Sequence, residues 1–321
     1  MDILGAIMEP FRWLVSFVMV AFHEGLTFIG LPAASGWTWT FSIIGLVIVI
    51  RAALIPVFVK QIKAQRGMQL LQPDLQKLQA KYKGKTDQLS RQAMAQEQMA
   101  LYKKHGTNPF SACLPMLIQM PFFFALFQVL SGISNANKSA TGIGAMTHDQ
   151  VVQFEQGSIF GAPLSASLLH GGGGNAVSVA VLSILMIVAM TASQFITQKQ
   201  IMAKNMSEAA MASPFMRQQK ILLYILPLVF GIGGINFPIG VLIYWTISNL
   251  WTMGQQFYVI RRMPAPGSPA AKALNERRAA KGLAPIDVTT GKTMKPEDMP
   301  PPPEPKAQRQ QPVRKNRKKK P

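Results

Sequence analysis

The sequence predicts an all-α polytopic membrane protein with five transmembrane helices. Hydrophobic residues make up 49% of its 321 residues, a composition typical of a chain that lies largely in a bilayer. Its lysines and arginines gather in polar connections and in the C-terminal part, which leaves the segments between them apolar. Apolar runs that can cross the hydrocarbon core lie at residues 39–59, 110–131, 177–197, 221–234 and 239–260.

Residues 1–37 are predicted to form an amphipathic helix that lies in the membrane interface. The apolar run from Trp13 to Phe22 is too short to span a bilayer, and charged residues flank it on both sides. A secretory signal peptide would begin with basic residues, whereas Asp2 and Glu9 precede the first arginine here. We therefore expect an interfacial helix outside the first span.

The first span, residues 39–59, contains one residue that an apolar helix does not explain. Arg51 lies about 8 residues from the end of the run that precedes Lys60, which places it roughly 12 Å deep at about 1.5 Å per residue. An arginine at this depth costs about 3 kcal/mol on insertion scales. A snorkelling side chain reaches about 6 Å, half of that depth. Because intramembrane charges usually face a bundle interior or a cavity, we expect Arg51 to face water inside the protein.

Residues 60–108 are predicted to form an antiparallel helical hairpin. Gly84 to Asp87 favour a turn between its two helices, and Pro73 favours a helix start or a kink. Apolar residues recur at helical spacing on both sides of the turn, at Leu71, Leu75, Leu78 and Tyr82 and again at Leu89, Met94, Leu101 and Tyr102.

The remaining connections differ in composition. Residues 132–175 are rich in Gly and Ser and contain one short predicted helix, Asp149–Gln156. Residues 198–220 form a short polar loop, and 236–238 leave room only for a tight turn. Proline, lysine and arginine dominate residues 261–321, a composition that predicts a disordered tail.

The distribution of basic residues predicts the topology. Residues 60–108 contain 10 Lys/Arg against 3 acidic residues, 198–220 contain 4 against 1, and 261–321 contain 16 against 5. Together they hold 30 of the 33 basic residues. The positive-inside rule makes these three segments cytoplasmic and the N-terminus and the 132–175 loop extracytoplasmic. This arrangement is N-out and C-in.

The predicted spans contain no Asp or Glu. This excludes from them the carboxylate relays of many proton-coupled transporters and the paired aspartates of intramembrane proteases. The single cysteine, Cys113, forms no disulfide framework or Cys-pair metal site. His23-Glu24 begins like a zinc-protease helix, but Thr27 stands where the second histidine belongs. The sequence therefore predicts no enzymatic activity, no cofactor and no metal.

Polar and amphipathic side chains recur in the spans, and two interpretations of them remain open. They form hydrogen bonds between helices, or they line a positively charged concavity around Arg51, near whose depth Gln119 and Gln194 are expected. Such a concavity would attract an anionic, hydrophilic polypeptide segment without an energy source or a covalent step. The other members of this set are Gln128, Thr191, Ser193, Tyr244, Trp245, Thr246, Ser248, Asn249 and Gln255.

Several runs resemble one family, the YidC-type membrane protein insertases (YidC/Oxa/Alb family). Asn108–Pro121 resembles the signature of their second span, and Phe237–Asn249 resembles their last span. The resemblance covers roughly residues 38–260 and is to the form found in high-GC Gram-positive bacteria. Motifs similar to their first span and cytoplasmic hairpin are Arg51 with Pro56, Met68–Pro73 and Lys81-Tyr82.

The resemblance implies a five-helix core around a hydrophilic groove that opens to the cytoplasm and the lipid and is closed to the outside. It implies an insertase and chaperone of the bacterial cell membrane. Arg51 corresponds to the groove's positive charge. Gln194 and Trp245 correspond to positions that line the groove, and Phe123 and Tyr244 to positions that meet the client's transmembrane segment.

The implied partners are nascent membrane proteins, membrane lipids, the Sec translocon and the ribosome. Ribosome contact would use the 60–108 hairpin and the 261–321 tail, for which binding to anionic lipid is the alternative. Two other functions remain open. One is an anion channel or carrier that uses Arg51, although the inverted repeats typical of carriers are not seen. The other is a non-translocating scaffold that recruits ribosomes.

Overall fold

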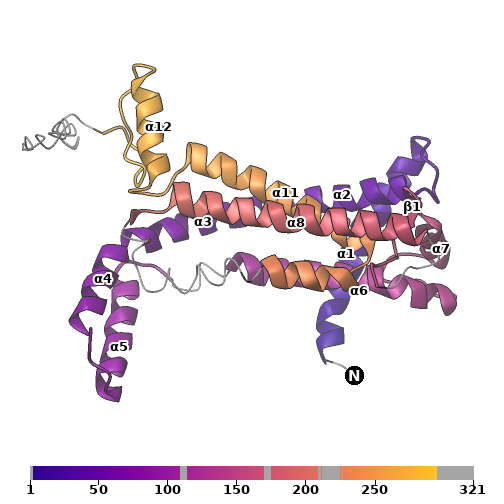
Figure 1. The fold of residues 1–321 in the computed structure, drawn as a ribbon, viewed down its shortest axis with the longest axis horizontal. Helices are drawn as coiled ribbons and strands as arrows, with labels where there is room; N and C mark the ends of the chain where they lie inside the picture. The colour runs from indigo at the N-terminus through magenta and orange to yellow at the C-terminus, as the bar shows by residue number, and fades with distance from the viewer. Residues whose placement is uncertain are drawn as a thin grey trace, which may run out of the picture.

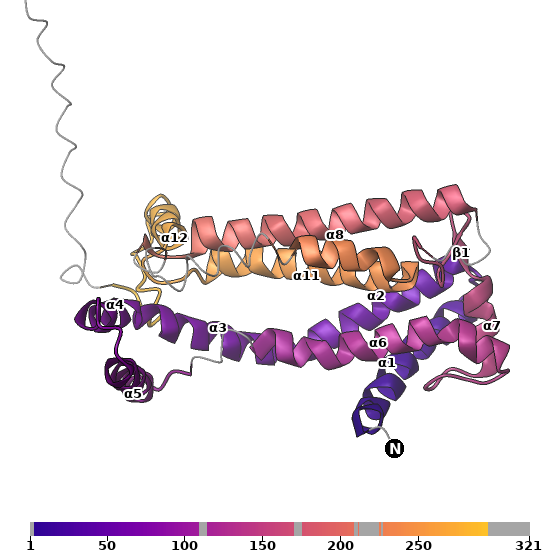
Figure 2. The same cartoon turned by 60° about the horizontal axis from the view of Figure 1, so that its bottom comes forward.

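The computed structural model describes residues 3–108, 114–169, 175–208, 211, 225 and 227–294. Its long helices run along one axis and form a bundle (Figures 1 and 2). Helices α8 and α11 lie in one layer, and α2, α3 and α6 lie in another (Figure 2). The members of the bundle are α2 (Gly36–Ala53), α3 (Ile55–Leu70), α6 (Leu114–Lys138), α8 (Ala176–Asn205) and α11 (Ile239–Arg262).

Shorter elements gather at the two ends of the bundle (Figure 1). One end carries α4 (Gln72–Lys81), α5 (Gln88–Lys104) and α12 (Pro269–Ala279). The other end carries α7 (His148–Gln156), which confirms the short helix predicted at Asp149–Gln156, and the antiparallel strands β1 (Ser158–Ile159) and β2 (Ala162–Pro163). A single 3-10 turn, η2 (Gly234–Asn236), leads into α11.

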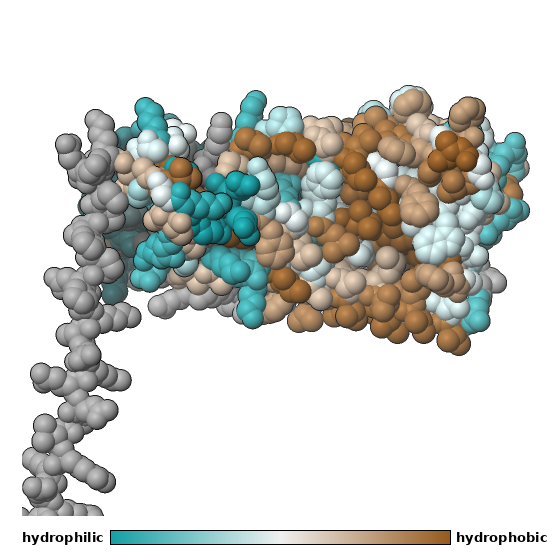
Figure 3. All heavy atoms as spheres, turned by 90° about the horizontal axis from the view of Figure 1, so that it is seen from above, coloured by the Kyte–Doolittle hydropathy of each residue, from teal (hydrophilic) through white to brown (hydrophobic). Residues whose placement is uncertain are grey.

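Four helical segments are long and apolar enough to cross a membrane. They are Gly5–Phe28, Gly36–Ala53, Leu117–Lys138 and Ala176–Asn205, and a shorter apolar helix covers Pro227–Asn236. In Figure 3 hydrophobic residues cover most of the bundle, and hydrophilic residues gather at its ends. These features are those of an all-helical polytopic membrane protein.

The predicted spans match this bundle in part. Helices α2, α6, α8 and α11 fall on the runs at 39–59, 110–131, 177–197 and 239–260, although α11 is not among the four apolar segments. The start of the second run, residues 110–113, and residues 221–224 and 226 of the fourth lie outside the described residues. That all five runs cross the membrane stays a prediction.

The first predicted span is interrupted, so the prediction of one continuous helix over 39–59 is wrong. Helix α2 ends at Ala53, and Leu54 separates it from α3. Pro56 explains the break, because proline has no N–H to donate and its ring clashes with the preceding turn. Arg51 therefore lies in the last turn of α2, where the carbonyl end of the helix dipole favours a cation.

Helix α1 (Ile3–Phe28) is longer than the apolar run within it. It continues through the polar residues before Trp13, where Arg12 pairs with Glu9 one turn away. The prediction that this segment is too short to span is therefore wrong, since Gly5–Phe28 has sufficient length and hydropathy. Nevertheless α1 crosses the other long helices at a steep angle (Figure 1). Its interfacial position stays a prediction.

The hairpin predicted over residues 60–108 contains α4 and α5, but its first residues, 60–70, belong to α3 instead. Helices α4 and α5 pack through Leu71, Leu75 and Tyr102, all buried. The turn lies at Gly84 to Asp87, as predicted. Gly84 has φ +85°, which favours glycine, and Asp87 caps α5. Leu89, one of the apolar positions of the predicted second helix, is 79% exposed and does not belong to this core.

The prediction of a disordered tail from residue 261 is wrong for residues 261–294. Helix α11 continues to Arg262, and α12 packs against α8 and α11. The alanine-rich sequence of α12 favours a helix, Ser268 caps it, and Pro269 occupies its first turn. Residues 295–321 lie outside the described part of the chain.

The apolar core lies toward the end of the bundle that carries α7 and β1. Close packing there requires glycine at Gly36, where a Cβ atom would lie 2.3 Å from the carbonyl oxygen of Ser158. The opposite half of the bundle is therefore left with the polar side chains of α2 and α11. Fully buried large side chains in the core include Trp39, Ile43, Leu46, Leu126, Leu130, Ile133, Phe154 and Ile239.

Candidate functional site

Arg51 is buried between α2 and α11. Only 8% of the residue is exposed, and its Nη2 donates a hydrogen bond to the backbone carbonyl of Ser248 at 3.3 Å. The guanidinium also lies over the ring of Phe58, 5.9 Å from its centroid. Its Nε has no hydrogen-bond partner, and none of the ion pairs among the described residues includes it. Within the part of the chain that the structure describes, Arg51 is thus a buried cation without a counterion.

Tyr244 and Gln119 join α11 to α6 beside this cation. Gln119 Nε2 donates a hydrogen bond to the Tyr244 hydroxyl at 2.7 Å, and Tyr244 is 3% exposed. Tyr244 stands one helical turn before Ser248, the residue whose carbonyl binds Arg51. Three of the predicted site residues therefore lie along one seam of the bundle.

Aromatic side chains extend this seam. Phe123 follows Gln119 by one turn of α6 and meets the ring of Trp245 edge-on at 4.7 Å, with Tyr244 at 6.5 Å. Trp245 also stacks on Phe237 at 5.7 Å and meets Phe230 at 4.8 Å. The structure thus brings together five of the six predicted residues, and the aromatic ones form a single cluster.

Gln194, the sixth predicted residue, belongs to α8. Its buried Oε1 has no hydrogen-bond partner. The link between α8 and α11 nearby is made by Asn249, whose Nδ2 donates to the Met190 carbonyl at 3.3 Å. Ser193 and Thr197 instead donate to carbonyls of their own helix. The interpretation that the polar side chains form hydrogen bonds between helices is therefore correct for Asn249, but it does not explain Gln194.

Buried polar atoms without partners recur on the inner helices. Each would cost about 1–3 kcal/mol if it stayed dry, so each of these atoms needs water or a polar ligand as its partner. Sequence reasoning missed Gln200, because α8 extends eight residues beyond the predicted span. The atoms are Arg51 Nε, Gln119 Oε1, Thr191 Oγ1, Gln194 Oε1, Gln200 Oε1, Thr246 Oγ1 and Ser248 Oγ.

A cavity of about 450 Å³ lies between α3 and α11 on the side of Arg51 that faces the hairpin. Phe58 belongs to both features, since it lines the cavity and carries the guanidinium of Arg51 on its ring. The other walls are mainly apolar and include Ile55, Val59, Leu250, Trp251 and Gln255.

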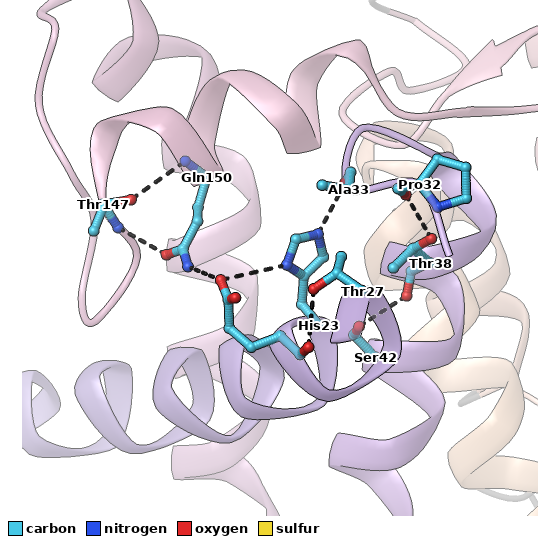
Figure 4. Close-up of polar contacts among 9 residues, drawn as sticks. His23, Thr27, Pro32, Ala33, Thr38, Ser42, Thr147 and Gln150 are labelled. Carbon is cyan, nitrogen blue, oxygen red and sulfur yellow. Dashed lines mark hydrogen bonds and ion pairs between the residues drawn. The ribbon is translucent and has the colours of Figure 1, made fainter. Parts of the chain in front are cut away.

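A packed polar network lies at the opposite end of the bundle (Figure 4). His23, 1% exposed, stacks on Trp39 at 3.8 Å and donates from Nε2 to the Ala33 carbonyl at 2.8 Å. Glu24 accepts a hydrogen bond from Gln150 of α7 at 2.7 Å. His23 is therefore a structural residue that ties α1 to α2. The described residues contain no group of three His, Cys, Asp or Glu side chains that could hold a metal.

The bundle and its site define a class of protein: a polytopic helical membrane protein with a buried, unpaired arginine in a polar interior. The particular family follows from comparison with known proteins. The family model described as 60Kd inner membrane protein matches residues 31–266. The chain belongs to this family.

Relatives described as "Membrane protein insertase YidC" occur in high-GC Gram-positive bacteria. The chain is 47% identical over 285 residues to one from Streptomyces avermitilis, covering 86% of the chain and 64% of that protein, or slightly less than two thirds of its length. It is 42% identical over 324 residues to one from Tropheryma whipplei (strain Twist), covering 98% and 97%. It is 35% identical over 330 residues to one from Bifidobacterium longum, covering 98% and 96%.

These findings confirm the resemblance predicted from the motifs. They also support the predicted location, since relatives of this kind and several candidate spans identify a multi-pass bacterial membrane protein.

Proposed function

We propose that the chain is a membrane protein insertase and chaperone. It moves short hydrophilic segments of client proteins across the membrane and their transmembrane segments into it, alone or with the Sec translocon. Its family and the names of its relatives support the insertase role.

The observation that carries the mechanism is the buried, unpaired cation of Arg51. A charge in a site of low dielectric acts strongly on an approaching acidic segment, and the orphaned polar atoms nearby offer hydrogen bonds to its backbone. The segment replaces the missing counterion, so it spends less of its path in hydrocarbon. This step needs neither a covalent intermediate nor a cofactor.

The aromatic cluster suits the second step, in which the client's apolar segment leaves for the lipid. Phe123 and Trp245, which are half-buried, form an apolar surface next to the buried ring of Tyr244. We infer that the client's transmembrane segment slides along this surface between α6 and α11. Rings suit this task because they offer contact area without a fixed set of hydrogen bonds.

The groove would open to the cytoplasm and be closed to the outside, with five spans in an N-out and C-in topology. The packed network around His23 supports closure at the outer end. The cavity between α3 and α11 supports access from the hairpin side. The hairpin of α4 and α5 would receive the client, and the basic C-terminal segment would contact the ribosome.

The test replaces Arg51 by Ala and by Lys and follows the insertion of a reporter with an acidic outer tail. We expect Arg51→Ala to lose most insertion and Arg51→Lys to retain part of it, because the charge is kept. Lys60→Ala, at an exposed cation nine residues away, is the matched control and should insert normally. Normal insertion by Arg51→Ala would contradict the mechanism. Anion flux in proteoliposomes that Arg51→Ala abolishes would instead identify a channel or carrier.

A further inference from the structure

The turn between β1 and β2 holds a phenylalanine in an unfavourable backbone conformation. Phe160 has φ +52° and Gly161 has φ +79°, and Ile159 pairs with Ala162 across them. A two-residue turn with both φ values positive favours Asn-Gly, and bulky side chains rarely adopt this conformation. Backbone strain of this kind is found mainly at functional sites, where the surrounding structure maintains it.

The side chain held in this way points away from the protein core. Phe160 is 73% exposed, and its ring meets Trp37 edge-on at 5.4 Å. Trp37 is 44% exposed and packs beside Phe41, which is 46% exposed. We call these three residues the outer aromatic patch. Burial against the described residues therefore does little to offset the strain of this turn, and the ring is left exposed.

The patch lies where two candidate spans begin. Ser158 of β1 packs directly on Gly36, the first residue of α2. Asn175, which caps α8, donates its backbone N–H to the Gly161 carbonyl at 3.3 Å. The strands therefore join the N-terminal ends of α2 and α8, at the end opposite the hairpin of α4 and α5 (Figures 1 and 2).

We propose that the outer aromatic patch anchors the protein in the headgroup region of the extracytoplasmic leaflet. The patch continues the exposed apolar surface of the two spans, on which Ile48 of α2 is 46% exposed and Val181 of α8 is 61% exposed. Aromatic rings concentrate at that depth of a bilayer. The strained turn fixes the Phe160 ring there and so sets the depth at which α2 and α8 enter the lipid. The inference depends on the membrane location and on the proposed N-out topology, but not on the insertase function.

The test places a polarity-sensitive fluorophore at position 160, as Phe160→Cys in a Cys113→Ser background of the full chain. The protein is reconstituted in nanodiscs with lipids that carry spin labels near the headgroup or deep in the chains. We expect a blue-shifted emission that shallow labels quench more than deep ones. Ser139→Cys, exposed after α6 at the same end, is the matched control and should be quenched by neither.

Equal emission and equal quenching at positions 160 and 139 would overturn the proposal. So would a blue-shifted label at 160 that no lipid quenches, because a protein partner would then cover the patch. Phe160→Asn tests whether the ring itself is needed for folding, because asparagine favours the same turn and removes only the ring. That variant should unfold in detergent at the same temperature as the parent or higher, and a clearly lower temperature would show that the ring is needed for folding.

Discussion

Some polar atoms of Arg51 and of the facing helix α11 have hydrogen-bond partners and others do not. Its guanidinium has one backbone acceptor, and the hydroxyls of Thr246 and Ser248 on the facing helix have none. A dry interior would make each of these atoms a loss of about 1–3 kcal/mol. A hydrated interior removes that loss and keeps the cation available, which is what the proposed attraction of an acidic segment requires.

Thr246→Val tests this uneven pairing at a single residue. Because the buried Thr246 hydroxyl has no protein partner, we expect the free energy of unfolding to stay the same or rise by about 1 kcal/mol. Insertion of an acidic-tailed reporter should fall, since the interior becomes less polar. Thermal unfolding and the insertion assay measure the two effects.

Thr197→Val is the matched control on α8. Its hydroxyl donates to the Ser193 carbonyl at 2.8 Å, so the same substitution should destabilise by about 1 kcal/mol. If Thr246→Val destabilised the protein as much as this control does, the Thr246 hydroxyl would be satisfied and the interpretation would be wrong.

The Gln119–Tyr244 pair gives a second prediction at this scale. Tyr244→Phe removes the hydroxyl that accepts from Gln119 Nε2, and we expect a loss of about 1 kcal/mol or more because the amide is left buried. Adding Gln119→Leu should recover part of that loss. A double-mutant cycle in thermal unfolding measures the coupling, and strictly additive losses would show that the two side chains do not interact.

Among the elements, the α4–α5 hairpin has a charged contact centred on Glu97. The Glu97 carboxylate accepts hydrogen bonds from Lys81 Nζ at 2.6 and 2.8 Å and from the Tyr82 hydroxyl at 2.8 Å. The Lys81 hydrogen bond, followed by that from Tyr82, lowers the pKa of Glu97. The same contact raises the pKa of Lys81.

This contact predicts an acid limit for the hairpin. A lowered pKa means that the stabilisation is present above the ordinary glutamate pKa of about 4.3 and is lost as pH falls through the lower folded value. Spin labels on α4 and α5 should therefore keep their distance at neutral pH and separate in acid. Glu97→Gln should loosen the pair already at pH 7, and an unchanged distance in that variant would refute the role of the contact.

Helix α12 carries the second prediction at this scale. Ser268 is fully buried, accepts a hydrogen bond from Ala271 N at 3.2 Å and donates to the Ala265 carbonyl at 2.7 Å. Ser268→Ala should cost about 1 kcal/mol of helix stability and release α12 from α8, which limited proteolysis after Arg277 and Arg278 would detect. Equal cleavage of parent and variant would mean that α12 does not depend on this cap.

For the whole molecule, hydropathy and periodicity predicted the helices that form the bundle and the hairpin. The break at Leu54 was missed because Pro56 was counted as one more apolar residue of a span. The ordered structure of residues 261–294 was missed because the disorder was predicted from the average composition of residues 261–321. The cap at Ser268 and the contact of Ala265 with Asn205 are local features that such an average does not register.

The site was predictable in its residues and not in its contacts. Arg51 was predictable from the free-energy cost of an arginine inside a membrane span, and Phe123 and Tyr244 were predictable from the family motifs. The Ser248 carbonyl that binds Arg51 has no side-chain signature, so only the packing of α2 on α11 reveals it. Gln200 was missed for a similar reason, because the length of α8 depends on its packing against neighbouring helices.

A hydrated interior around Arg51 that is open to the cytoplasm is the central claim, and the labelling of a cysteine at position 51 tests it most directly. Arg51→Cys in a Cys113→Ser background is exposed to a membrane-impermeant maleimide from either side of sealed vesicles. Leu46→Cys, fully buried in the apolar core of the same helix, is the control. The account predicts that position 51 reacts from the cytoplasmic side and position 46 from neither. Protection of both positions, or labelling of position 51 only from the outside, would contradict it.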